Sequence, residues 1–360
     1  MKLRQKIALE LARKIRNNDK QLHVLRQLFW ESTLRCNVHC RHCGSDCKAT
    51  EQTPDMPFAD FLRAIDSITP HVDPHKVMII ISGGEPLVRD DLELCGAELY
   101  RRGFPWGMVT NGLYLTPQRY QQLLDAGLHA LTISLDGFET DHNWLRGHKQ
   151  SFQKAADAVR MVADTPSQVV WDVVTCVNRR NIKTLPEFAE FLYKIGVRRW
   201  RLFTIDPMGR AKNMPELHID DADFVWLLDF IAALRKEGKM HVSYSCEGFL
   251  GDYEGFVRDH FYQCAAGISI ASVLIDGSIS ACTSIRGKYY QGNIYTDDFW
   301  DVWQNRFQNY RNREWMRKDA CADCKMFRYC EGNGMHLRDV DGNLMVCHYQ
   351  KIQNAKQLCK

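Results

Sequence analysis

Cysteines in two clusters are the residues of this sequence most suited to chemistry. Of the 14 cysteines, four lie close together near the N-terminal end, at Cys36, Cys40, Cys43 and Cys47. Seven more lie in the C-terminal part, at Cys264, Cys282, Cys321, Cys324, Cys330, Cys347 and Cys359. Clustered thiols in a reducing compartment indicate metal sites. No apolar N-terminal segment precedes a cleavage site, so we expect a cytoplasmic protein rather than a secreted disulfide scaffold.

The first cluster has the spacing Cys-x3-Cys-x2-Cys, at Cys36, Cys40 and Cys43. Three thiolates on one tight loop can hold three irons of a [4Fe–4S] cube, which leaves the fourth iron open to a small molecule. Zinc with Cys47 as fourth ligand is the alternative, although this spacing does not match common zinc knuckles.

Short motifs with ligand-type residues follow the later β-rich segments. Gly83-Gly84-Glu85-Pro86 ends one of them. Glycines there allow the backbone to approach a ligand closely, and Glu85 can accept hydrogen bonds from an ammonium group. Further such residues stand at Asn111, Ser134, Asp136, Arg146, Asn178 and Met208.

Together, the cysteine loop and these motifs resemble the radical S-adenosylmethionine (SAM) superfamily. The resemblance implies that Cys36, Cys40 and Cys43 hold a catalytic [4Fe–4S] cluster whose open iron binds SAM. It also implies that the 83–86 motif holds the methionine amino group and that Arg146 pairs with the methionine carboxylate. The implied cofactor contacts are His42, Gly83, Gly84, Glu85, Pro86, Asn111, Ser134, Asp136, Arg146, Asn178 and Met208.

The same resemblance implies the reaction. A reduced cluster cleaves SAM to methionine and a 5′-deoxyadenosyl radical, which abstracts a hydrogen atom from a substrate. A one-electron reductant such as flavodoxin or ferredoxin is then an expected partner. A non-catalytic iron–sulfur scaffold is the alternative of another class, but a scaffold needs neither the 83–86 motif nor Arg146.

The second cluster resembles the SPASM extension of radical SAM enzymes, in which about seven cysteines hold two auxiliary clusters. The resemblance implies one complete auxiliary [4Fe–4S] cluster, with zinc as the alternative, at Cys321, Cys324, Cys330 and Cys347. A second auxiliary cluster would involve Cys264 and Cys282, but Gly334 stands where the family has the next cysteine. A cluster with other ligands and no cluster at all both stay open there.

The other cysteines are assigned no metal. Cys95, Cys176 and Cys246 are expected to be small core residues. Cys47 and Cys359 stay unassigned.

Alternating β-rich and helical segments must position these residues. The β-rich runs are 28–34, 77–82, 106–110, 130–135, 169–177 and 199–205. Helical patterns lie at 58–69, 90–102, 116–126, 151–163 and 184–195. Several of the β-rich runs are apolar on both faces, as a covered parallel sheet requires. We therefore predict an α/β fold, a partial (β/α)6 parallel barrel of the radical SAM type, with ligands at the carboxyl ends of its strands.

Three segments are predicted along the chain. Residues 1–27 form a basic amphipathic helix, 28–239 the radical SAM core, and 240–360 the Cys-rich SPASM-like domain. A helix at 221–236 joins the last two, and Asp276-Gly277 marks a hairpin. The i, i+4 spacing of Leu3, Ile7, Leu11 and Ile15 leaves two alternatives. The first helix packs on the body, or it presents a surface to a partner or an acidic peptide.

Composition excludes several classes of protein. With 45% hydrophobic and 25% charged residues, the chain is globular rather than disordered. A net charge of +3 gives no argument for nucleic-acid binding. The longest aliphatic run, at 77–81, is far too short for a membrane span.

The leading hypothesis for function is a maturase that acts on a ribosomally synthesised peptide or small protein, as most SPASM-bearing enzymes do. Short strings at 43–47 and 332–338 resemble a subgroup found beside small lipoproteins in Bacteroidetes. Modification of a haem-like tetrapyrrole is the alternative, because related enzymes with reduced cysteine sets perform it. A sulfatase maturase is disfavoured, since that group has a carboxylate where this chain has Thr283.

Overall fold

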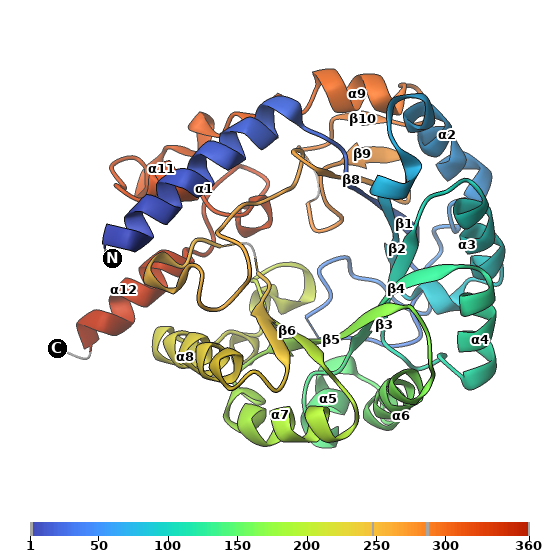
Figure 1. Ribbon diagram of the computed structural model, residues 1–360, viewed down its shortest axis with the longest axis horizontal. Helices are drawn as coiled ribbons and strands as arrows, with labels where there is room; N and C mark the ends of the chain where they lie inside the picture. The colour runs from blue at the N-terminus through green and yellow to red at the C-terminus, as the bar shows by residue number, and fades with distance from the viewer. Residues whose placement is uncertain (1–2, 247, 286–287, 359–360) are drawn as a thin grey trace.

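The computed structural model describes residues 3–246, 248–285 and 288–358 (Figure 1). Its strands form a ten-stranded sheet in the order β10-β9-β8-β1-β2-β3-β4-β5-β6-β7. The strands are β1 (Gln27–Thr33), β2 (Met78–Gly83), β3 (Trp106–Thr110), β4 (Leu128–Ser134), β5 (Val170–Val177), β6 (Arg199–Thr204), β7 (His241–Tyr244), β8 (Ile270–Val273), β9 (Ser278–Ser280) and β10 (Gly292–Asn293). Pairing is parallel from β8 through β1 to β7 and antiparallel at β8–β9 and β9–β10.

Helices cover the outside of this curved sheet (Figure 1). They are α1 (Leu3–Leu22), α2 (Phe58–Ile68), α3 (Leu92–Arg101), α4 (Pro117–Asp125), α5 (Glu139–Arg146), α6 (Ser151–Asp164), α7 (Leu185–Lys194), α8 (Asp221–Glu237), α9 (Phe299–Asn305), α10 (Gln308–Arg311), α11 (Phe327–Cys330) and α12 (His348–Leu358). Each crossover between consecutive strands from β1 to β7 carries at least one helix. The predicted α/β architecture with a partial parallel barrel is confirmed. None of the described helices is both long and apolar enough to cross a bilayer.

Large aromatic side chains fill the layer between sheet and helices. Trp30, Trp106 and Trp200, on β1, β3 and β6, are completely buried. Trp30 stacks on Phe61 of α2 with ring centroids 4.8 Å apart. Burial of such large side chains on both faces of a parallel sheet removes much apolar area from water, which stabilises the barrel that holds the strand ends in place.

The sheet continues into the Cys-rich segment. β8 pairs in parallel with β1, with Gln27 opposite Ile270, and the Glu31 carboxylate of β1 accepts a hydrogen bond from the Ile275 N–H at 3.0 Å. The β8–β9 hairpin turns at Gly277, whose φ of +82° favours glycine. The C-terminal segment is therefore attached directly to the edge of the barrel, and the division at residues 239/240 stays a prediction.

Helix α1 contacts the body through an unexpected face. Its buried residues are Leu9 and Arg16, whereas the four apolar residues at i, i+4 spacing are all exposed: Leu3, Ile7, Leu11 and Ile15. The helix packs on the body with Leu9 and Arg16 buried, and its apolar stripe points away.

Candidate active site

The first cysteine cluster lies on the loop that follows β1, at the carboxyl end of the barrel strands. The thiols of Cys36, Cys40 and Cys43 are all reduced, and the first two are buried. The loop is tied to α5, because the His39 N–H donates to the Arg146 carbonyl oxygen at 3.1 Å. Three reduced thiols on one loop next to a cavity are a donor set that fits a [4Fe–4S] cluster with an open iron.

The turn after β6 holds this loop from the other side. Arg210 donates from Nε to the Cys40 carbonyl oxygen at 2.7 Å and from Nη1 to the Cys47 carbonyl oxygen at 3.1 Å. Gly209 has φ +53°, and a Cβ added there would lie 2.3 Å from the Cys43 carbonyl oxygen. Glycine is thus required where the two loops meet. Arg210 was not among the predicted site residues, although it lies next but one to Met208.

Arg146 and Asp136 form a buried ion pair beside the cysteine loop. Arg146 Nε lies 2.6 Å from Asp136 Oδ2, and its Nη1 lies 3.8 Å from Cys40 Sγ. Burial opposes ionisation of Asp136, but the Arg146 charge lowers the pKa of that carboxyl group to about 2. The positive charge of the Arg146 guanidinium is therefore neutralised by the Asp136 carboxylate on one edge. Its other edge faces the Cys40 thiol.

Glu85 links two strand ends. Its carboxylate accepts hydrogen bonds from Thr110 Oγ1 at 2.7 Å and from the Asn111 N–H at 2.8 Å. Burial raises the pKa of Glu85, against the effect of these hydrogen bonds. The residue predicted to accept from an ammonium group thus also fixes the end of β3 against the loop after β2.

The titratable groups of the loop differ in their surroundings. Burial raises the pKa of Cys36 to about 12, whereas a hydrogen bond with Cys47 lowers the pKa of Cys43 to about 5, aided by Arg210. Burial also lowers the pKa of His42 to about 4, so its ring is neutral at pH 7. His42 Nδ1 is buried and has no hydrogen-bond partner among the described residues.

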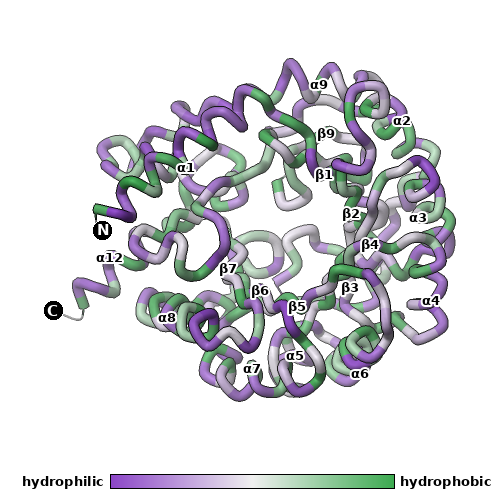
Figure 2. Tube along the Cα trace, viewed as in Figure 1, coloured by the Kyte–Doolittle hydropathy of each residue, from purple (hydrophilic) through white to green (hydrophobic). Residues whose placement is uncertain are grey.

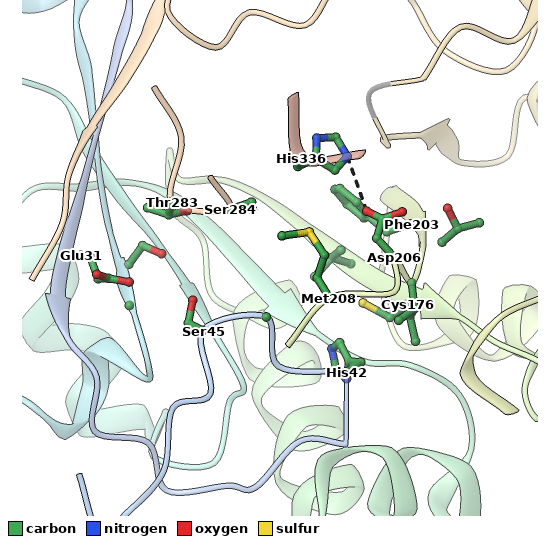
Figure 3. Close-up of a pocket in the computed structure, with 16 residues that line it drawn as sticks. Glu31, His42, Ser45, Cys176, Phe203, Asp206, Met208, Thr283, Ser284 and His336 are labelled. Carbon is green, nitrogen blue, oxygen red and sulfur yellow. Dashed lines mark ion pairs between the residues drawn. The ribbon is translucent and has the colours of Figure 1, made fainter. Parts of the chain in front are cut away.

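A cavity of about 340 Å³ opens beside His42 (Figure 3). Its walls come from the barrel and from the C-terminal segment: Glu31, His42, Gly44, Ser45, Ser82, Gly83, Val174, Cys176, Phe203, Thr204, Ile205, Asp206, Met208, Thr283, Ser284 and His336. Asp206 Oδ2 and His336 Nε2 lie 3.5 Å apart across it. Burial raises the pKa of Asp206, against the effect of His336. The described lining includes two carboxylates but neither lysine nor arginine.

The predicted cofactor residues fall into two sets. His42, Gly83 and Met208 line the cavity. The others are not in its lining: Gly84, Glu85, Pro86, Asn111, Ser134, Asp136 and Asn178 lie at or just after strand ends, and Arg146 ends helix α5. Of these, Asn111 binds the cysteine loop directly, because its Nδ2 donates to Asn37 Oδ1 at 2.7 Å.

Several lining residues were missed by sequence reasoning. Cys176 was expected in the core, but the alternation of β5 turns it into the cavity. Asp206 and His336 were given no function, because they are 130 positions apart in the chain and meet only in the folded molecule. The one available signal was the position of Asp206 just after β6, at the ligand-binding end of the sheet.

The C-terminal cysteines form two groups. Burial and the nearby Cys347 and Cys321 raise the pKa of the Cys330 thiol, and burial with Cys321 and Cys324 raises that of Cys347. Each of these four thiols thus interacts electrostatically with at least one of the others. Arg338 Nη2 lies 3.4 Å from Cys321 Sγ.

Cys264 and Cys282 make up the second group. Burial, together with the nearby Cys264, raises the pKa of the Cys282 thiol. The Arg313 guanidinium donates to the carbonyl oxygens of both Cys264 and Asn333 at 3.3 Å. Arg313 therefore holds Asn333, the residue before Gly334, close to Cys264. Cys359 lies outside the described residues.

Comparison with known proteins identifies the domains and the fold of the chain. The family model of the radical SAM superfamily matches residues 30–192, and that of the SPASM iron–sulfur cluster-binding domain matches residues 264–325. The chain is 27% identical to an AdoMet-dependent heme synthase of Methanosarcina barkeri (85% of this chain, 90% of that protein). It is 28% identical to a mycofactocin maturase of Mycolicibacterium smegmatis (88% and 79%). The structure of native anSMEcpe with bound AdoMet and Cp18Cys peptide superposes with a TM-score of 0.71 at 18% identity (93% and 97%).

Proposed function

Because this chain belongs to the radical SAM superfamily and carries a SPASM domain, we propose that it modifies a side chain of a ribosomally synthesised peptide or small protein. It is an enzyme that uses SAM and iron–sulfur clusters. When bound, the reduced radical cluster and SAM supply the radical that abstracts a hydrogen atom from the substrate. The electron comes from a one-electron reductant such as flavodoxin or ferredoxin.

We assign the radical cluster to Cys36, Cys40 and Cys43 and SAM to the adjacent strand ends. His42, Gly83 and Met208 contact the cofactor from the cavity wall. The remaining predicted contacts act at the strand ends, at Gly84, Glu85, Pro86, Asn111, Ser134, Asp136 and Asn178, and at the end of α5, at Arg146. One auxiliary cluster is assigned to Cys321, Cys324, Cys330 and Cys347, and the incomplete site to Cys264 and Cys282.

The cavity is the observation that supports a peptide substrate. At about 340 Å³ it lies near the lower end of the range of about 300–1,000 Å³ that is usual for small-molecule sites. It must also admit part of SAM, so it has room for one inserted side chain rather than a whole macrocycle. The barrel and the C-terminal segment both line it, so a peptide can bind along their junction while one residue enters. The protein's own contribution is to orient that residue and to exclude water.

A tetrapyrrole substrate is the second candidate, favoured by the similarity to heme synthases over most of the chain. Haem-like tetrapyrroles carry several carboxylates, which bind best beside lysine or arginine. The described cavity lining instead carries Glu31 and Asp206. Placing anionic groups beside these carboxylates is unfavourable, and this charge pattern makes us prefer the peptide.

Mass spectrometry of candidate substrates after anaerobic reaction distinguishes the two. The candidates are the small proteins encoded next to this gene and iron-coproporphyrin III, each with SAM and a chemical reductant. We expect one of the peptides to change in mass with the wild-type enzyme. The same peptide should keep its mass with the Cys36→Ala variant. Conversion of the porphyrin with no change in any peptide would contradict the proposal.

A further inference from the structure

Helix α1 lies against the protein with Leu9 and Arg16 buried, and it carries an apolar stripe that faces solvent. The exposed fractions of Leu3, Leu11 and Ile15 are 73%, 56% and 62%. Ile7 and Leu22 continue the same stripe, which the hydropathy-coloured trace shows as green segments between purple ones along α1 (Figure 2). An exposed apolar stripe of this length marks an interaction surface.

Polar contacts fix this orientation. Gln5 Nε2 donates to the Asp252 carbonyl oxygen at 2.8 Å, and Arg16 donates to the carbonyl oxygens of Arg328 and Tyr329. Lys20 pairs with Glu331. Because these contacts join α1 to the cysteine-rich end, the helix cannot turn its stripe inward without breaking buried hydrogen bonds and ion pairs.

The charge of α1 indicates which kind of partner binds to its apolar stripe. Six basic and two acidic residues give this helix a net charge of +4, against +3 for the whole chain. Both acids are engaged, Glu10 with Arg13, Arg328 and Tyr329, and Asp19 with Gln263. The free cations are spread along and beside the stripe and have no ion-pair partner among the described residues: Arg4, Lys6 and Lys14.

We propose that α1 is an interfacial helix that binds the surface of an anionic lipid membrane. A basic amphipathic helix lies in the membrane plane, with its apolar face among the acyl chains and its cations at the phosphates. Here the helix is already folded and fixed, so little ordering is required on binding. The exposed Phe256 stands beside the N-terminal half of α1, across a hollow lined by Arg4 and Gln5, and adds an aromatic side chain to the same region.

The geometry of α1 favours a lipid surface over a peptide helix as its binding partner. Peptide helices are usually held in a groove, whereas the stripe residues Leu11, Ile15 and Leu22 are 56%, 62% and 60% exposed. A lipid surface meets a single exposed helix along its whole length, which suits cations distributed from Arg4 to Lys14. The proposal is independent of the substrate of the enzyme.

Vesicle sedimentation of the anaerobically reconstituted protein tests the proposal. The vesicles contain phosphatidylcholine alone or mixed with phosphatidylglycerol. We expect binding to the anionic vesicles and at least about tenfold weaker binding for Leu11→Gln/Ile15→Gln. Lys6→Gln/Lys14→Gln should weaken binding by about thirtyfold at low salt. The controls, Leu94→Gln on α3 and Lys154→Gln on α6, alter residues that are also exposed, and these variants should bind like the wild type.

The opposite results overturn the proposal. Equal binding to neutral and anionic vesicles, or unchanged binding of both double variants, would show that α1 is not the lipid contact. Absence of vesicle binding, combined with a dimer that dissociates in Leu11→Gln/Ile15→Gln, would make the stripe a contact between two copies. Binding of a synthetic acidic amphipathic helix in place of vesicles would assign it to a peptide.

Discussion

Arg146 and Asp136 give the most specific test at the scale of single residues. Removal of Arg146 leaves a buried Asp136 without its counter-charge, and breaking a buried pair costs about 3–5 kcal/mol. Arg146→Ala should therefore lower the melting temperature as well as weaken SAM binding. In Asp136→Asn/Arg146→Ala the stability should largely return while SAM affinity stays low. Equal SAM affinity of the wild type and both variants would place Arg146 in a structural role only.

Arg210 provides a second residue-scale prediction, about the cysteine loop. Its guanidinium holds two carbonyl oxygens of the loop, at Cys40 and Cys47, and also pairs with the exposed Asp46. Arg210→Ala should reduce the iron retained at the radical cluster, because the loop loses charge-assisted hydrogen bonds worth about 1.5–3 kcal/mol each. Asp46→Asn is the matched control and should keep its iron, since exposed ion pairs contribute little. Equal iron content in both variants would refute this role.

At the scale of elements, the strands and helices with clear hydrophobic periodicity could be predicted from the sequence. The short strand β7 and the mostly polar helix α5 could not. The six β-rich runs and the helices between them have strong periodicity, and all are present in the structure. β7 has only four residues, and α5, from Glu139 to Arg146, is mostly polar, so neither has a clear pattern. The stripe of α1 was recognised, but its direction depends on distant partners such as Glu331, which a local pattern cannot reveal.

The segment around Gly334 tests the assignment of the incomplete auxiliary site. Gly334 has φ −61° and ψ 144°, which any residue can adopt, so a side chain is compatible with its backbone. Gly334→Cys should supply a third thiolate near Cys264 and raise the iron content of reconstituted protein by about two to four atoms. The control, Gly334→Ser, should leave iron at the wild-type level of about eight to ten atoms. No gain from the cysteine would mean that Cys264 and Cys282 do not bind a cluster.

At the scale of the whole molecule, the cavity depends on the attachment of the C-terminal segment to the barrel. β8 extends the sheet beside β1, which brings Thr283, Ser284 and His336 over the cavity opposite Asp206 (Figures 1 and 3). The two cysteine clusters could be predicted as metal sites from their spacing. The cavity could not, because it is formed by residues from both ends of the chain whose approach depends on strand order.

The formation of 5′-deoxyadenosine from SAM under anaerobic conditions with a chemical reductant tests the central claim most directly. Reconstituted wild-type protein should form it, whereas Cys36→Ala/Cys40→Ala/Cys43→Ala should not, because no thiolates remain to hold the radical cluster. Cys95→Ala, which alters a buried cysteine of α3, is the control and should behave like the wild type. Formation above background by the triple variant would contradict the account, since SAM cleavage would then not depend on the loop after β1.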